Sequence, residues 1–111
     1  MSLATELSDA EVDRIFKALA GATRRDIVQR TLVAAVSVSD LASAYSMSFA
    51  AVQKHVAVLE TAGLVTKRPV GKERLVEGNP LTIQRAQQLL DQYEQLWRSR
   101  VDRLDALLSQ E

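Results

Sequence analysis

The sequence contains no cysteine and only one histidine, His55, among its 111 residues. Without thiols, disulfides, zinc ribbons and cysteine nucleophiles are excluded, and a single imidazole excludes a multi-histidine metal site within one subunit. No apolar run approaches the roughly 18 residues of a membrane span, and no basic segment precedes an apolar one at the N-terminus. We therefore expect a cytoplasmic protein with no metal, no cofactor and no membrane association. Such a chain is expected to bind a partner rather than to act as an enzyme.

Neither sign of charge is in excess, because Lys and Arg number 14 and so do Asp and Glu. Basic residues nevertheless gather in two segments, 17–36 and 61–78. They are Lys17, Arg24, Arg25 and Arg30 in the first, and Lys67, Arg68, Lys72 and Arg74 in the second. Because salt screens charges beyond about 8 Å, such clusters can attract a polyanion to one face of a neutral protein. Solvated surface charge is the alternative interpretation, and composition does not decide between the two.

Capping residues divide the first part of the chain into four expected helices. Each helix should begin at a Ser or Thr that accepts a hydrogen bond from a backbone N–H of the first turn. The expected N-caps are, in order, Ser8, Thr23, Ser37 and Ser48. Ser8 also forms a Ser-x-x-Glu capping box with Glu11, which predicts a first helix over about 8–20. The fourth helix should end near residue 62, because Gly63 stands where a C-terminal cap is expected.

The residues after Gly63 change from helical to extended character. Two short β-prone runs, 64–68 and 74–77, flank turn residues and predict a hairpin over about 64–78 with a basic tip. After it, apolar residues step by three or four along one long helix over about 81–108. The expected fold is therefore mainly α with a small β-hairpin, in one domain that spans residues 1–111.

Two short helices over about 37–62, followed by a basic hairpin, are typical of a winged helix-turn-helix. At 100° per residue, Val52, Val56 and Leu59 define the buried stripe of the second helix. The opposite side carries Ala50, Lys54, Ala57 and Thr61, with Gln53 beside them. Small residues allow close approach to bases, Gln53 can pair with an adenine edge, and Lys54 can reach a guanine or a phosphate. The hairpin side chains Lys67, Arg68, Lys72 and Arg74 are candidate DNA-backbone or groove contacts.

Several motifs together resemble the ArsR (ArsR/SmtB) family of bacterial transcriptional regulators over about residues 12–80. They are LAGATRR (19–25), Asp40-Leu41-Ala42, SFAAVQKHVAVL (48–59) and ETAGLV (60–65), followed by a Gly-x-x-Arg hairpin. The resemblance implies a winged helix-turn-helix with N- and C-terminal dimerisation helices. It also implies that the first two turns of the fourth helix read DNA, which maps onto Ser48, Phe49, Ala50, Gln53 and Lys54. The family's wing maps onto residues 67–74.

Four of these residues have alternative interpretations. Phe49 is either a thymine-methyl contact or a residue at the edge of the core. His55 lies near DNA by family position, but it also lies close to the buried stripe, where a packed histidine is equally expected. Arg24 and Arg25 could contact phosphate, or could pair with carboxylates such as Asp26 or Glu60.

The sequence departs from the metal-sensing members of the family. Ser37 and Ser39 stand where those members have cysteine, and the last helix has no histidine. The carboxylates of Asp91, Glu94, Asp102 and Asp105 alternate with arginines, which is typical of a solvated helix face. We therefore expect no metal to regulate the protein.

The last helix carries an apolar face too wide for a small domain to cover, which predicts a homodimer. The candidate interface residues are Val12, Ile15 and Phe16 on the first helix, with Leu90, Tyr93, Trp97, Val101 and Leu104 on the last. The leading hypothesis is a sequence-specific DNA-binding repressor that binds double-stranded DNA at a pseudo-palindromic operator. The alternatives are a winged-helix protein-interaction module without DNA binding, or a DNA-binding regulator switched by an organic small-molecule effector.

Overall fold

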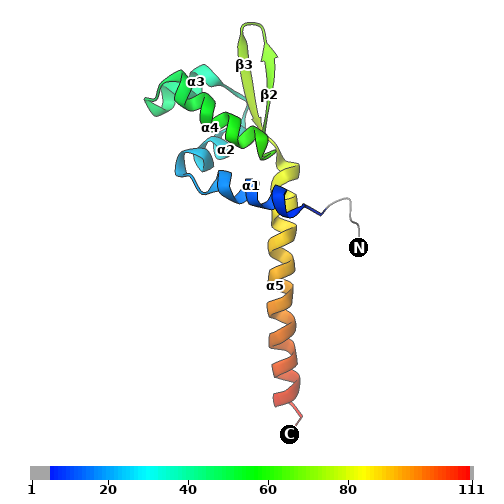
Figure 1. The fold of residues 1–111 in the computed structure, drawn as a ribbon. Helices are drawn as coiled ribbons and strands as arrows, with labels where there is room; N and C mark the ends of the chain where they lie inside the picture. The colour runs from blue at the N-terminus through cyan, green and yellow to red at the C-terminus, as the bar shows by residue number, and fades with distance from the viewer. Residues whose placement is uncertain (1–5, 111) are drawn as a thin grey trace.

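The computed structural model describes residues 6–110, which form five helices and three short strands (Figure 1). In chain order they are α1 (Asp9–Leu19), α2 (Ala22–Val33), β1 (Val36–Ser37), α3 (Val38–Tyr45), α4 (Phe49–Thr61), β2 (Val65–Val70), β3 (Glu73–Gly78) and α5 (Pro80–Leu108). The mainly helical winged helix-turn-helix architecture expected from the sequence is thus confirmed. Within residues 6–110, none of the helices combines the length and the apolar character that crossing a bilayer requires.

Three of the four predicted helix caps are confirmed. Ser8 Oγ accepts from Glu11 N at 3.1 Å, and Glu11 Oε1 accepts in return from Ser8 N at 2.9 Å, which completes the capping box. The hydroxyls of Ser37 and Ser48 cap α3 and α4 in the same way. The prediction for Thr23 is wrong, because α2 begins two residues earlier, with Gly21 as its N-cap.

The corner between α1 and α2 explains the paired arginines of the LAGATRR segment. Arg24 Nε donates to the carbonyl of Ala18 at 2.7 Å, and Arg25 Nη1 donates to the carbonyl of Leu19 at 2.8 Å. The last carbonyls of a helix lack partners within the helix and carry partial negative charge, so two guanidinium groups satisfy and stabilise this end. A Cβ on Gly21 would lie 3.0 Å from Arg24 Cζ, so a side chain at this position would have to displace the Arg24 guanidinium. The carboxylate partners considered from the sequence are not used here, because both guanidinium groups bond to backbone carbonyls.

The three strands form one antiparallel sheet in the order β1-β3-β2. Strands β2 and β3 pair from Val65↔Gly78 to Val70↔Glu73, so the predicted hairpin is confirmed, with longer strands and a tighter turn than the β-prone runs indicated. Pro69 fits within the ladder because β2 is an edge strand, where a missing N–H is tolerated. The two-residue strand β1 was not predicted, because two residues carry no readable alternation.

The core lies between α1–α4 and the base of the sheet. Its fully buried large side chains are Ile15, Ile27, Leu41, Val52, Val56, Leu59, Leu64, Val65 and Val76. Among the described residues of α5, only Thr82 and Ala86 are buried. The rest of this 29-residue helix extends away from the body (Figure 1), and the molecule measures 71 × 29 × 23 Å.

A polar junction joins the end of α4 to the beginning of α5. Gly63 follows α4 in a left-handed conformation (φ 77°), which places its carbonyl beside the first turn of α5. That carbonyl accepts from Thr82 Oγ1 at 2.6 Å and from Asn79 Nδ2 at 3.1 Å. Asn79 also caps α5, because its Oδ1 accepts from the N–H of Leu81. The direction of α5 is therefore fixed relative to the helix before it.

The turn between α3 and α4 contains a residue under backbone strain. Ser46 has φ 54° and ψ 35°, the left-handed conformation that costs L-residues about 1–2 kcal/mol. We predict that Ser46→Gly stabilises the protein by about 0.5–1 kcal/mol, measured as the free energy of unfolding in urea. Ser46→Ala is the control and should give no gain, because alanine keeps the strain. A Ser46→Gly variant less stable than wild type would contradict the prediction.

Candidate nucleic-acid interface

Helix α4 presents one face to the core and the opposite face to solvent. Val52, Val56 and Leu59 are completely buried, which confirms the stripe predicted from the sequence. The candidate base-reading residues Ser48, Phe49, Ala50, Gln53 and Lys54 are all exposed, and they occupy the cap and the first two turns. The N-terminal half of α4 is therefore free to enter a groove of DNA, which is what a recognition helix requires.

The two ambiguous residues of α4 lie at different depths. The Phe49 side chain is 49% exposed, so it stands at the rim of the core with half of its surface open to a partner. His55 is half-buried on the shoulder of α4 next to the core stripe. Of the two, Phe49 has the larger apolar surface available for a base.

An ion-pair and hydrogen-bond cluster fixes α3 against α2. The carboxylate of Asp26 accepts hydrogen bonds from the Tyr45 hydroxyl and from Arg30 Nε, the latter at 2.8 Å. The Arg30 guanidinium also lies over the Tyr45 ring, 5.2 Å from its centroid. The hydrogen bonds of Tyr45 and Arg30 lower the pKa of Asp26, while burial and the Asp26 carboxylate raise the pKa of Tyr45 to about 12. At neutral pH Asp26 is therefore ionised and Tyr45 protonated, so the cluster is intact and positions the helix that precedes the recognition helix.

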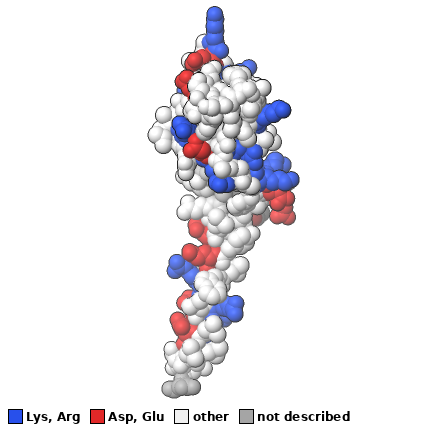
Figure 2. All heavy atoms as spheres, turned by 90° about the vertical axis from the view of Figure 1, so that its left-hand side faces the viewer, with Lys and Arg blue, Asp and Glu red and all other residues white. Residues whose placement is uncertain are grey.

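The four basic residues of the wing fall into two pairs. At the base, Lys67 Nζ lies 3.5 Å from Glu60 Oε1 of α4, and Arg68 Nη2 lies 3.2 Å from Glu77 Oε1 on the neighbouring strand. At the tip, Lys72 and Arg74 are exposed and make no ion pair with any residue that the structure describes. Figure 2 shows basic side chains projecting from this end of the molecule. Of the four wing cations, the two at the tip of the hairpin are thus the ones without an ion pair.

The carboxylates of α5 are spread along the helix and are not gathered at one point. Across residues 6–110, no three His, Asp or Glu side chains gather in an arrangement that could hold a metal ion. Glu94 instead pairs with Arg98 one helical turn away, at 3.4 Å. Ser37, at the family's cysteine position, is buried as the cap of α3.

Of the candidate dimer residues, one is buried within the protomer and the others are at least partly exposed to solvent. Ile15 is only 2% exposed, so its side chain belongs to the protomer core and its assignment to a dimer interface is corrected. Phe16 and the α5 residues Leu90, Tyr93, Trp97 and Leu104 are each at least 40% exposed, while Val12 and Val101 are partly exposed. Arg100 lies over the Trp97 ring at 5.8 Å. An apolar stripe along α5 therefore remains uncovered in the single chain.

Comparison with known proteins relates this geometry to a family of regulators. The chain is 38% identical over 81 residues to the HTH-type transcriptional regulator Rv2034 of Mycobacterium tuberculosis, which covers 73% of this chain and 76% of that protein. The structure of this chain is similar to that of the ArsR-like transcriptional regulator from Rhodococcus sp. RHA1. The TM-score is 0.78, and the sequences are 28% identical over 88% of this chain and 92% of that one.

A third similar structure is the homodimeric winged helix-turn-helix DNA-binding domain Mb0332 from Mycobacterium bovis. It has a TM-score of 0.62 and 24% identity, covering 85% of this chain and 92% of that one, so it supports the fold alone. No family model matches the sequence. Of these three proteins, the two with more than 25% identity are transcriptional regulators and not enzymes, in agreement with the expectation from composition. The chain belongs to the ArsR family of transcriptional regulators, with the winged helix-turn-helix fold that this family uses to bind DNA.

Proposed function

We propose that this protein is a repressor that acts as a single-domain homodimer and binds a pseudo-palindromic DNA operator by sequence. The observation that carries the proposal is the combination of an exposed α4 N-terminus with an unpaired basic hairpin tip. The first supplies side chains for base edges and the second supplies cations for phosphates, which are the two kinds of contact that sequence-specific binding needs. Repression follows because an occupied operator excludes other proteins from the same DNA.

In the proposed complex, α4 lies in the major groove with Gln53 and Lys54 toward the bases. Ser48 and the exposed part of Phe49 approach the edge of the groove, and Ala50 allows close contact. Lys72 and Arg74 reach the adjacent backbone or minor groove, while Lys67 and Arg68 remain closer to Glu60 and Glu77. Two protomers related by a two-fold axis place their α4 helices on one face of the duplex, separated by a whole number of helical turns.

The proposed dimer is supported by the uncovered stripe of α5. A soluble monomer rarely exposes a contiguous apolar strip of this length, whereas a second copy would cover it. At 100° per residue, the stripe residues lie within about 40° of Trp97. They are Leu90, Tyr93, Trp97, Val101, Leu104 and Leu108. Phe16 of α1, which is also exposed, is a further apolar side chain that we propose for the interface.

The charges along α5 support an antiparallel pairing of the two α5 helices, with Trp97 at the two-fold axis. In that register Leu90 faces Leu104 of the second copy and Tyr93 faces Val101. Asp91 then meets Arg103, and Glu94 meets Arg100, so every charged pair is of opposite sign. A parallel pairing would bring identical residues together, including like charges.

The protein-interaction alternative is favoured only by the zero net charge. It requires neither Gln53 nor the unpaired tip cations, and so it leaves these exposed groups without a role. The alternative of a regulator switched by an organic ligand shares the fold and the DNA site, and differs by an additional binding site.

The first functional prediction concerns base reading. Gln53→Ala should lower affinity for an operator selected from random duplex DNA by about 1–3 kcal/mol and relax the preference at one base pair. Lys54→Ala should also weaken binding. Gln95→Ala is the matched control, because Gln95 is an exposed glutamine on α5. Wild-type affinity and base preference in both α4 variants would show that α4 is not the reading helix.

The second concerns the wing tip. Replacing Lys72 and Arg74 together by Gln should weaken binding to all DNA sequences and reduce the slope of log K against log[salt] by up to about 2. Arg98→Gln, which removes a cation from distal α5, should leave the slope unchanged. Fluorescence anisotropy over a salt series measures both. An unchanged slope in the double variant would place the wing away from DNA.

The third concerns the dimer and its register. Trp97→Ala should weaken self-association at least tenfold in sedimentation equilibrium, because large aromatic side chains contribute strongly to interfaces. Since the chain has no cysteine, Leu90→Cys combined with Leu104→Cys should form a disulfide-linked dimer under mild oxidation. Leu104→Cys alone should not, because antiparallel pairing separates the two copies of residue 104 by about 21 Å. Efficient crosslinking of the single variant would indicate parallel helices, and a monomeric wild type at micromolar concentration would refute the dimer.

A further inference from the structure

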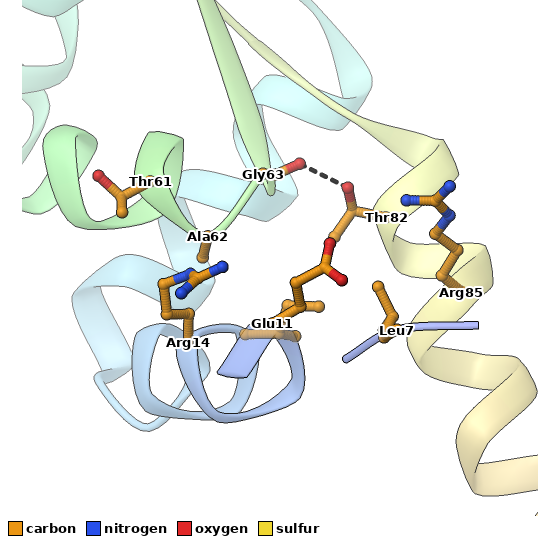
Figure 3. Close-up of a pocket in the computed structure, with 9 residues that line it drawn as sticks. Leu7, Glu11, Arg14, Thr61, Ala62, Gly63, Thr82 and Arg85 are labelled. Atoms are coloured by element: carbon orange, nitrogen blue, oxygen red, sulfur yellow. Dashed lines mark hydrogen bonds between the residues drawn. The ribbon is translucent and has the colours of Figure 1, made fainter. Parts of the chain in front are cut away.

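Two adjoining hollows lie where α1 faces the second half of α4. The larger is an open groove of about 310 Å³ lined by Arg14 and Lys17 of α1 and by Ala57, Val58 and Thr61 of α4. The smaller, about 140 Å³, lies at the base of α5 and shares Arg14 and Thr61 with the groove. Figure 3 shows the Arg14 guanidinium near Ala62 in this smaller hollow, with Glu11 on its other side. Arg14 therefore stands between the two spaces.

The groove combines an apolar floor with positive charge. Val58 is 43% exposed, and Ala57 beside it is exposed too, so the floor is an open apolar surface. Arg14 and Lys17 make no ion pair with any residue among 6–110, and no acidic residue lines the groove. An exposed apolar floor beside two cations without ion pairs can contact both the apolar body and the charged group of an amphipathic ligand.

Glu11, the acidic residue of the smaller hollow, is already engaged. Its carboxylate accepts the N–H of Ser8, and the hydrogen bonds with Ser8 lower its pKa, with smaller contributions from the charges of Arg85 and Arg14. Glu11 lines only the smaller hollow. The end of the groove that remains attractive to an anion is accordingly the one between Arg14 and Lys17.

We propose that this groove binds an amphipathic organic anion. Its carboxylate or sulfonate lies between the Arg14 guanidinium and the Lys17 ammonium, and its apolar body covers Ala57 and Val58. The groove volume is at the lower end of the range for small-molecule pockets, which suits a ligand the size of a medium-chain fatty acid. A charge-assisted contact at one end and apolar burial along the rest are together the usual basis of affinity at such sites.

A second copy of the chain does not account for this groove. Arg14 and Phe16 are two residues apart on α1, so their side chains point about 200° apart around the helix. Phe16 is proposed for the dimer interface, whereas Arg14 and Lys17 line the side of α1 toward α4. The groove thus stays open when the dimer surface is covered.

Occupation of the groove is expected to lower DNA affinity, and this part rests on the proposed function. The groove residues Ala57 and Val58 follow Lys54 by one turn of the same helix. An anion bound there reduces the positive potential beside the DNA-facing end of α4 and repels the phosphates. By linkage, DNA should reduce affinity for the anion by the same factor.

Binding is tested on the ¹⁵N-labelled full chain without DNA, with octanoate as the probe and 1-octanol as its neutral counterpart. Octanoate should produce saturable amide shifts centred on Arg14, Lys17, Val58 and Thr61, and 1-octanol should bind roughly tenfold more weakly because it lacks the charge. Equal binding of the two probes, shifts confined to the α5 stripe, or no saturable shift would each overturn the site.

Two variants separate charge from shape. Arg14→Gln combined with Lys17→Gln should weaken octanoate binding roughly tenfold and leave 1-octanol binding unchanged. Lys72→Gln is the matched control, which removes one exposed cation elsewhere, and should bind octanoate as wild type does. Val58→Glu, at a half-exposed position that the fold tolerates, should abolish octanoate binding. Wild-type octanoate affinity in the Arg14/Lys17 variant would refute the proposal.

The effect on DNA is measured separately by anisotropy with the selected operator. Saturating octanoate should lower wild-type affinity severalfold, and the Arg14/Lys17 variant should bind DNA normally but respond little to octanoate. A wild type that binds octanoate in the groove but binds no DNA would refute the proposed function and leave the site intact. Normal DNA binding with no octanoate in the groove would refute the site alone.

Discussion

The carbonyl of Gly63 is the point on which the arrangement of this molecule depends. It accepts hydrogen bonds from Thr82 and Asn79, and the left-handed turn at Gly63 brings these α5 residues against the end of α4. Because α5 buries only two of its residues against the body, the hydrogen bonds of this junction hold the helix in an orientation that side-chain packing fixes for the other helices. It sets the angle between the helix proposed to read bases and the helix proposed to hold two subunits together, and so it would also set the spacing of two recognition helices.

The predictable parts of the fold were those with local signals. The capping box of Ser8 and Glu11, the caps of α3 and α4, and the Val52–Val56–Leu59 stripe all depend on residues within one or two turns of each other. The parts not predicted depend on distant partners. Strand β1 exists only because β3 pairs with it, and Arg24 and Arg25 are used by carbonyls six residues back across a corner.

In the candidate interface, too, local patterns were predictable and contacts between distant residues were not. Helical periodicity identified which side of α4 faces solvent, since an amphipathic helix has only one side to bury. It could not show that Glu60 and Glu77 engage the basal wing cations and leave those at the tip unpaired, because these pairs join separate elements. Nor could it show that Ile15, which shares its helix and apolar character with Phe16, belongs to the protomer core.

The uncovered outer part of α5 bears on how DNA-binding activity depends on the concentration of the protein. If self-association completes the DNA-binding species, the concentration of that species rises with the square of the protomer concentration while protomers predominate. Halving synthesis would then reduce the active form nearly fourfold. A gene controlled in this way would respond to changes in regulator abundance as a threshold, without any ligand-induced change in shape.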